Sequence, residues 1–211
     1  MKNTLLFIAL WMILSPVTAQ KDIEKHIPFS GKKSLELNIQ IADSIAIHTW
    51  NKQEVYVRAT VNLNDNKDNE AYRTSFDEEG QMVRIKAFIE EDYFKGKKNC
   101  CMETMILWEL YIPENTAFTA ETIDGNIFID GSTTEIRAKT ISGFIDWEVL
   151  PNRKADLELK TISGTIYSDL DIAHGKAGNS FPVVISDKLN QGGYRVSLET
   201  ISGDIFCRRS N

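Results

Sequence analysis

Four aspartates in the second half of the chain have the side chains best suited to catalysis: Asp130, Asp146, Asp169 and Asp171. A carboxylate cluster can hold a metal ion or act as a base, as in the β-helical enzymes that cleave acidic polysaccharides. The second half of the chain contains a repeat with a fixed glycine, described below. The four aspartates lie at different distances along the chain from these glycines, so stacking of the repeats would not bring the four side chains into one row. The sequence pairs no nucleophile with a base and has no phosphate-binding loop. We therefore expect no catalytic residues and no enzyme activity.

The three cysteines are Cys100, Cys101 and Cys207. They are too few for a disulfide framework. Adjacent residues on a strand point to opposite faces, so only one of Cys100 and Cys101 could easily pair with Cys207. A strained Cys100–Cys101 bridge and buried free thiols are the other two possibilities. With no Cys-x-x-Cys spacing and three widely separated histidines, we expect no zinc site, no other metal and no cofactor.

Residues 1–19 have the features of a secretory signal peptide. Lys2 provides the positive start, Leu5 to Leu14 form an apolar run, and Val17-Thr18-Ala19 supply small residues for cleavage. The run is shorter than the ~20 residues that span a bilayer, and no later segment is apolar enough to do so. A short N-terminal anchor or a buried strand is the alternative. We expect an exported protein that is periplasmic, outer-membrane-associated or secreted.

The remaining residues 20–211 are long enough for one domain with a substantial core. The 211-residue chain has a net charge of −6. An acidic surface argues against binding nucleic acid or anionic lipid through bulk charge.

Apolar residues recur with a period of two along most of the chain, which predicts strands with one buried face. The segments that show this are Leu35–Ile41, Ile45–His48, Val55–Val61, Val83–Ala87 and Ile106–Ile112. Pro113 should end the last of these strands. Three polar excursions are expected between strands, at Asn62–Gln81, Glu90–Asn99 and Ala173–Ser180. Within the first, Asn69–Phe76 is read as a loop or a single turn.

Four segments of the second half share a Thr-Ile-(Ser/Asp)-Gly motif followed two residues later by isoleucine. The motif threonines and glycines are Thr122 and Gly125, Thr140 and Gly143, Thr161 and Gly164, and Thr200 and Gly203. The threonines are 18, 21 and 39 residues apart. The last spacing is long enough for two repeat units, one of which would lack the motif. Repetition at about 20 residues predicts a solenoid, in which stacked units bury a continuous core.

Each position of the repeat has a role in folding. Two apolar residues before the threonine share the buried face. Threonine suits a strand and can form hydrogen bonds across the stack. Glycine marks a bend that needs a positive φ or the absence of Cβ. The residues before the threonines, Glu121, Lys139, Lys160 and Glu199, should form an exposed row of mixed charge. A ligand-binding stripe is the alternative for this row.

The repeat resembles that of the putative adhesin family of bacterial envelope proteins. The segments Ile47–Val57, with Trp50 before a turn, and Tyr111–Thr116 are also similar to that family. The resemblance covers nearly all of residues 20–211. It implies an all-β, β-solenoid or β-helix-like roll, with N-terminal strands over 20–115 stacked on repeat rungs over 116–211. It implies no catalytic residues.

We expect a non-enzymatic binding or scaffold module of the cell envelope whose ligand is a protein or a glycan. The alternatives are an envelope-stress accessory or sensor that acts through protein contacts and, less favoured, a polysaccharide-active β-helix enzyme. Four aromatic residues near the bends could form a binding patch or fill the core: Phe144, Trp147, Tyr167 and Phe206. The chain has six residues after Ile205. We therefore expect an uncapped final rung that packs on a partner or on a second copy.

Overall fold

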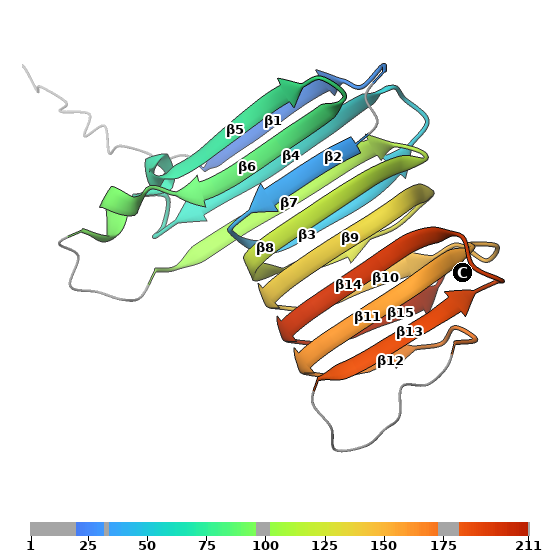
Figure 1. Cartoon of the computed structure of the whole chain (residues 1–211). Coiled ribbons are helices and arrows are strands. Elements are labelled where there is room, and N and C mark those ends of the chain that lie inside the picture. The colour runs from blue at the N-terminus through green and yellow to red at the C-terminus, as the bar shows by residue number, and fades with distance from the viewer. Residues whose placement is uncertain (1–19, 32–33, 96–101, 173–181, 211) are drawn as a thin grey trace, which may run out of the picture.

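The computed structural model describes residues 20–31, 34–95, 102–172 and 182–210, and it is almost entirely β (Figure 1). Fifteen strands form one large mixed sheet, which confirms the all-β prediction. Two 3₁₀ helices, η1 (Asn69–Ala71) and η2 (Glu91–Phe94), interrupt it. Within these residues no helix has the length and apolar character needed to cross a membrane. The predicted signal peptide and the excursion at Ala173–Ser180 lie outside the described residues.

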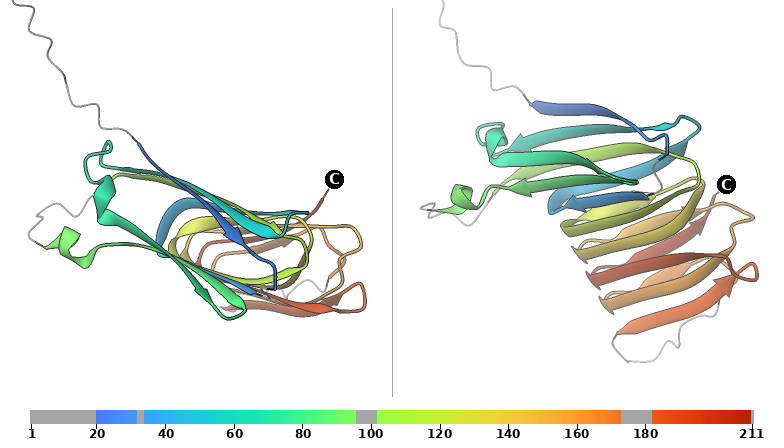
Figure 2. Two further views of the ribbon diagram at one scale, coloured as in Figure 1. Left: turned by 90° about the horizontal axis from the view of Figure 1, so that it is seen from above. Right: turned by 45° about the horizontal axis from the view of Figure 1, so that its top comes forward.

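The sheet turns back on itself within the long strand β8 (Thr116–Ile129), so that two layers face each other (Figure 2, left). The first half of β8 pairs with strands of the front layer and the second half with strands of the back layer. In spatial order, the front layer contains β5 (Tyr72–Glu79), β6 (Met82–Ile89), β2 (Ser34–Ile39), the first half of β8, β9 (Thr133–Ser142), β14 (Tyr194–Ser202), β11 (Ala155–Ser163) and β13 (Val183–Leu189).

The back layer starts with antiparallel pairs and continues with parallel ones. In spatial order, it contains β1 (Lys21–Pro28), β4 (Glu54–Leu63), β7 (Thr104–Pro113), β3 (Ile41–Trp50), the second half of β8, β10 (Ile145–Val149), β15 (Ile205–Arg209) and β12 (Ile166–Ser168). Strands are present at all the predicted period-two segments, and β7 ends at Pro113 as expected, but Leu35–Ile41 is divided at Gln40 between β2 and β3.

The core lies between the two layers and is formed by every second residue of most strands, whereas β1, β5 and β12 contribute little to it. On β4, for example, Val55, Val57 and Val61 are fully buried. The two largest buried side chains are Trp108 and Trp147, so Trp147 fills the core and contributes to no surface patch. The indole nitrogen of Trp108 donates to the Tyr72 hydroxyl at 3.0 Å, which satisfies a buried polar atom that would otherwise be costly.

The four repeat strands stack in register. Thr122 pairs with Thr140, Thr140 with Thr200, and Thr200 with Thr161, and all four are buried. Their hydroxyls donate to backbone carbonyls at the bends: Thr140 to Gly125 at 3.0 Å and Thr161 to Gly203 at 2.9 Å. The expected hydrogen bonds between threonine side chains are therefore replaced by bonds to backbone carbonyls: Thr122, Thr140 and Thr161 bond to the bend of a neighbouring rung, whereas Thr200 bonds to Gly203 in its own bend.

The repeat glycines lie where the backbones of neighbouring rungs come closest. A Cβ on Gly143 would overlap the carbonyl oxygen of Gly125, and one on Gly203 would overlap that of Gly143. A Cβ on Gly164 would likewise overlap the carbonyl oxygen of Gly203. Because backbone atoms cannot move aside as a flexible side chain can, glycine is required here by the contact between rungs as well as by the bend.

The C-terminal rung is inserted between two earlier rungs. Strand β14 pairs with β9 on one side and with β11 on the other, and β15 lies between β10 and β12 in the same way. The expectation that this rung is uncapped and exposed at the end of the stack is therefore wrong. The 39-residue spacing holds no extra rung in the described residues, because β13 returns antiparallel beside β11 and forms the free edge.

The first polar excursion is more ordered than its composition predicts. Within Asn62–Gln81, η1 is followed by β5, which pairs antiparallel with β6 across a turn at Gly80. Reading Asn69–Phe76 as a loop or single turn is therefore correct only for its first three residues. Tyr72 anchors β5 because its ring is fully buried and its hydroxyl donates to the Ile41 carbonyl at 3.1 Å. The polar residues around it lie on the exposed edge.

Candidate functional site

A row of side chains crosses the outer face of the back layer, with one residue from each neighbouring strand. Tyr56 on β4 pairs with His26 on β1 and with Tyr111 on β7, and Tyr111 pairs with His48 on β3. Trp50 lies two residues beyond His48 on the same face. We call these five residues the aromatic row. Tyr56 and Tyr111 lie between buried neighbours on their strands, so strand alternation turns their rings outward, and the strand register places His26 and His48 beside them on the same face.

The rings of the aromatic row touch in sequence across four strands. The ring centroids are 4.7 Å apart for His26 and Tyr56, 6.1 Å for Tyr56 and Tyr111, and 5.1 Å for Tyr111 and His48. Trp50 lies 5.4 Å from Tyr111 and 6.1 Å from Tyr56. Neighbouring rings are tilted by 33–43°. The rings thus form an open, continuous platform instead of an enclosed cage.

Carboxylates flank the platform and hold its tyrosines in place. The Tyr56 hydroxyl donates to Glu24 at 3.1 Å, and the Tyr111 hydroxyl donates to Glu109 at 2.9 Å. The bond to Glu109, followed by partial burial, raises the pKa of Tyr111 above its ordinary value. Both phenols therefore stay protonated at neutral pH. Each carboxylate keeps acceptor sites that the tyrosine does not use, because an ionised carboxylate has about four lone-pair positions.

The aromatic row ends on β3 at His48, which contacts Asp130, the residue that follows β8. The Nδ1 atom of His48 lies 2.6 Å from a carboxylate oxygen of Asp130. This hydrogen bond raises the pKa of His48 above 6.5, while burial partly opposes the rise. A positive charge on His48 is thus favoured near neutral pH, next to the ring of Tyr111.

Lys52 and Glu54 lie at the tip of the platform, in the turn between β3 and β4. The Lys52 ammonium group lies 4.3 Å from the centroid of the Trp50 ring and 3.8 Å from Glu54. The Trp50 indole nitrogen donates to the Glu54 carbonyl at 2.8 Å. His26 also contacts the Glu54 carboxylate, at 3.4 Å. These contacts fix the orientation of Trp50 before any ligand binds.

A second aromatic group continues along the outer face of the back layer. Phe128, Phe144 and Phe206 meet edge to face at 5.3 and 5.8 Å, and Tyr167 stacks on Phe206 at 5.2 Å. Three of the four bend aromatics named in the sequence analysis are therefore at the surface, and Trp147 is in the core. Half of the Tyr167 side chain is exposed.

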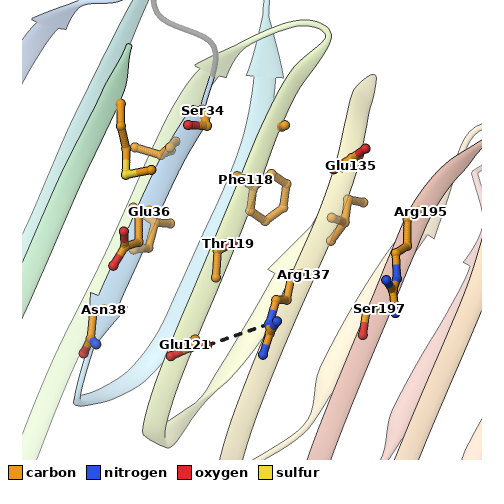
Figure 3. A pocket seen from close by; sticks show the side chains of 15 residues that line it. Ser34, Glu36, Asn38, Phe118, Thr119, Glu121, Glu135, Arg137, Arg195 and Ser197 are labelled. Carbon is orange, nitrogen blue, oxygen red and sulfur yellow. Dashed lines mark ion pairs between the residues drawn. The ribbon is translucent and has the colours of Figure 1, made fainter. Parts of the chain in front are cut away.

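The front layer has a different outer face, which contains a polar depression of about 620 Å³ over β2, β8, β9 and β14 (Figure 3). Its charged side chains pair within the protein. Arg137 lies 3.9 Å from Glu121, and Arg195 lies 2.6 Å from Glu158. Its aromatic residue, Phe118, is buried beneath the strands. The depression therefore offers a ligand few unpaired charges and no ring to stack on.

The four candidate aspartates have separate partners. Asp130 contacts His48, Asp146 accepts two hydrogen bonds from the Arg208 guanidinium at 2.6 and 2.8 Å, and Asp169 accepts from the Arg209 backbone N–H at 2.9 Å. Asp171 is exposed. Within the described residues no three histidine, cysteine, aspartate or glutamate side chains are grouped as metal ligands would be.

The repeat residues and cysteines of the sequence analysis lie away from the aromatic row. The repeat threonines and glycines line the bends and hold the rungs together. Cys207 is fully buried on β15, and burial, with Asp146 and Asp169 nearby, raises the pKa of its thiol to about 12. Cys100 and Cys101 lie outside the described residues, so a bridge to Cys207 stays a prediction.

The aromatic row was not assembled by sequence reasoning, although its members were visible. His48, Trp50, Tyr56 and Tyr111 each occupy the outward position of a clean period-two strand. An aromatic side chain at a position that should face water is the signal that could have found them. Their proximity depends on the pairing order β1-β4-β7-β3, which no local pattern specifies.

The fold resembles those of solved bacterial proteins. A "putative cell adhesion protein" from Clostridium sporogenes superposes with a TM-score of 0.58 at 11% identity, over 91% of this chain and 100% of that one. A "putative adhesin" from Bacteroides fragilis gives a TM-score of 0.23 at 8% identity, over 92% and 99% of the two chains. No protein-family model and no curated protein sequence matches the chain. The first of these structures shows that the chain shares its fold.

Proposed function

We propose that this chain is an exported, non-enzymatic, adhesin-like module of the bacterial cell surface that binds its ligand on the aromatic row. The supporting observation is the row itself, in which five rings lie on one outer face, touch one another and contribute little to the core. Partly exposed aromatic side chains that are fixed by hydrogen bonds are typical of binding surfaces.

The scaffold supports this function because it is rigid. We propose that the front and back layers form a β-solenoid-like roll, with the N-terminal strands stacked on the repeat rungs. In such a stack each rung contacts only its neighbours, and extended faces are presented to solvent. Strands β1, β4, β7 and β3 then hold the aromatic row at a fixed spacing of about 4.8 Å per strand. A ligand therefore finds the rings already placed, which lowers the entropic cost of binding.

Two other functions have less support. A polysaccharide-cleaving enzyme needs clustered carboxylates, whereas Asp146 and Asp169 are held by Arg208 and the Arg209 backbone. An envelope-stress accessory would bind a protein partner through the same surface. We propose no cofactor, no metal and no nucleic-acid partner, the last because the chain has a net charge of −6.

Binding of the purified, fluorescently labelled protein to whole bacterial and host cells tests the proposal. We expect saturable binding that Trp50→Ala and Tyr111→Ala each weaken by roughly tenfold, the equivalent of about 1.4 kcal/mol. Tyr194→Ala is the control, because Tyr194 is a half-exposed tyrosine that starts β14 in the front layer, away from the aromatic row. Equal binding by all three variants at unchanged thermal stability would refute a role for the aromatic row.

A further inference from the structure

We infer that the aromatic row binds an uncharged carbohydrate chain that lies across strands β1, β4, β7 and β3. This inference rests on the function proposed above and adds the chemical class of the ligand. Three observations support it: the open row of rings, the charges around it, and the occupied cation site at Trp50.

The row has the shape that a sugar chain needs. A pyranose ring has one face rich in C–H groups, which carry a slight positive charge and pack on the negative face of an aromatic ring. The rings of His26, Tyr56, Tyr111 and His48 follow one another at centroid distances of 4.7, 6.1 and 5.1 Å. These steps are about the size of one sugar ring, so successive sugars can stack on successive strands.

The flanking groups are suited to hydroxyls. Glu24, Glu109 and Asp130 border the row, and each has acceptor positions beyond the one used by its tyrosine or histidine. Sugar hydroxyls are donors that such carboxylates can accept from. Aromatic faces beside polar acceptors give the mixed apolar and polar contacts by which specific sites orient their ligands.

The charges around the row exclude an acidic chain. Four carboxylates surround the rings: Glu24, Glu54, Glu109 and Asp130. The permanent cations beside them are Lys52, which pairs with Glu54, and Arg58, which lies between Glu24 and Glu109 in the strand register. The histidines of the row, His26 and His48, each contact a carboxylate, and with the positive charge favoured on His48 the four carboxylates still outnumber the three cations Lys52, Arg58 and His48. The excess of carboxylates repels uronic acids, sulfated sugars and phosphate-bearing chains.

A cationic ligand also fits poorly. Aromatic recognition of a cation is strongest when rings enclose and desolvate the charge. Here the rings are tilted by only 33–43° to one another and form an open platform. The Trp50 face, the strongest cation site of the row, is already covered by Lys52 at 4.3 Å. An uncharged, hydroxyl-rich chain is the class that remains.

Titration calorimetry with four probes tests the inference: a soluble neutral β-glucan, a neutral mannan, polygalacturonate and poly-L-lysine. We expect row-dependent binding to at least one neutral glycan and no row-dependent binding to the two charged polymers, although the acidic chain can attract poly-L-lysine elsewhere on its surface. Trp50→Ala and Tyr111→Ala should weaken binding roughly tenfold. Tyr111→Phe should stay within about threefold of the unmodified protein, because it keeps the ring and loses only the hydroxyl that contacts Glu109.

The outcomes separate this inference from the proposed function. Row-dependent binding to polygalacturonate or poly-L-lysine would overturn the ligand class and leave the row as a binding surface. Row-dependent binding to cells without binding to either neutral glycan would do the same and would favour a protein ligand. A loss with Tyr111→Phe as large as that with Tyr111→Ala would argue against ring stacking. If cell binding does not depend on the row either, both proposals fail.

Discussion

Gly143 and its counterparts lie where neighbouring backbones meet, and the hydroxyl of Thr140 donates to the carbonyl of Gly125 at the same place. The threonine and the glycine of the repeat are therefore explained through contacts at the bends. Its threonine satisfies a buried carbonyl, and its glycine makes room for the next backbone. The motif recurs because each rung must meet the next in the same way, and binding by this protein must depend on other residues.

Substitution of Gly143 by alanine should lower the free energy of unfolding by about 2–3 kcal/mol, because its Cβ would overlap the Gly125 carbonyl. Gly80→Ala is the control. Gly80 has a φ of +53° but no atom within 4 Å of an added Cβ, so only backbone strain of about 1 kcal/mol is expected. Urea denaturation measures both variants. Equal losses would show that the backbone conformation, and not the contact between rungs, requires glycine.

The pair of His48 and Asp130 should make stability depend on pH. The folded-state pKa of His48 is raised above 6.5, so the pair contributes its full stabilisation below pH 6.5 and loses it as the pH rises through the folded-state pKa. The effect should be below about 1 kcal/mol, because both side chains are partly exposed. Denaturation curves from pH 6 upward should therefore show a decline that is absent from His48→Gln. An identical slope in the variant would contradict this assignment.

Most of the strands were predictable from the sequence, but β1, β5 and β13 were not, and neither was the spatial order of the strands. The period-two pattern identified the strands with one buried face, since burial dictates alternation. The exposed charged residues that precede the motif threonines show why the order of the strands matters. In chain order the residues are Glu121, Lys139, Lys160 and Glu199, which would place two lysines side by side. In the structure β14 separates them, so Glu199 lies 3.6 Å from Lys139 and 3.4 Å from Lys160.

The same limit applies to the aromatic row. Its residues occupy outward positions that the alternation predicts, but the pairing of β4 with β7, and of β7 with β3, joins segments far apart in the chain.

Strand β5 was missed for another reason. Its polar residues read as a loop, while Tyr72 provides the buried anchor that local composition does not reveal.

Removal of residues 194–211 should abolish cooperative folding. Strands β9 and β11 would lose their shared neighbour β14, and β10 and β12 would lose β15. We expect the shortened chain to show no sharp thermal transition by circular dichroism.

Two substitutions on β14 test the same point in the full-length chain. Leu198→Ala, at a fully buried position, should cost about 2–5 kcal/mol. Ser197→Ala, on the outer face of the same strand, should change stability by less than about 0.5 kcal/mol. Comparable losses for the two would mean that β14 is not packed as described.

At the scale of the whole molecule, the two outer faces have different chemistry. The front face has ladders of paired charges, and the back face has the aromatic row and the group of Phe128, Phe144, Phe206 and Tyr167. Because the contacting aromatic rings lie on one outer face, the proposed ligand-binding residues all point in one direction. The other face is then free to meet solvent.

Copies of the chain should associate through β13, one of the edge strands of the sheet. Among the described residues β13 pairs with β11 alone, and half of the Val184 side chain is exposed on it. A free edge exposes unpaired backbone donors and acceptors that a second strand can satisfy. Light scattering should show a mass that rises with concentration, and Val184→Lys should reduce the rise, whereas Thr119→Lys in the middle of the front face should not. A constant monomer mass at millimolar concentration would contradict this prediction.

The inserted C-terminal rung also determines how the molecule should respond to mechanical load. Ordinary linear repeat arrays unravel from a terminus, one unit at a time, because the last unit has a single neighbour. Here β15 is paired on both sides, with β10 and with β12, and β14 is paired on both sides with β9 and β11. Tension applied at that end would shear two ladders at once instead of peeling one. A surface protein pulled by flow or by an attached cell would thus be anchored through the middle of its own stack.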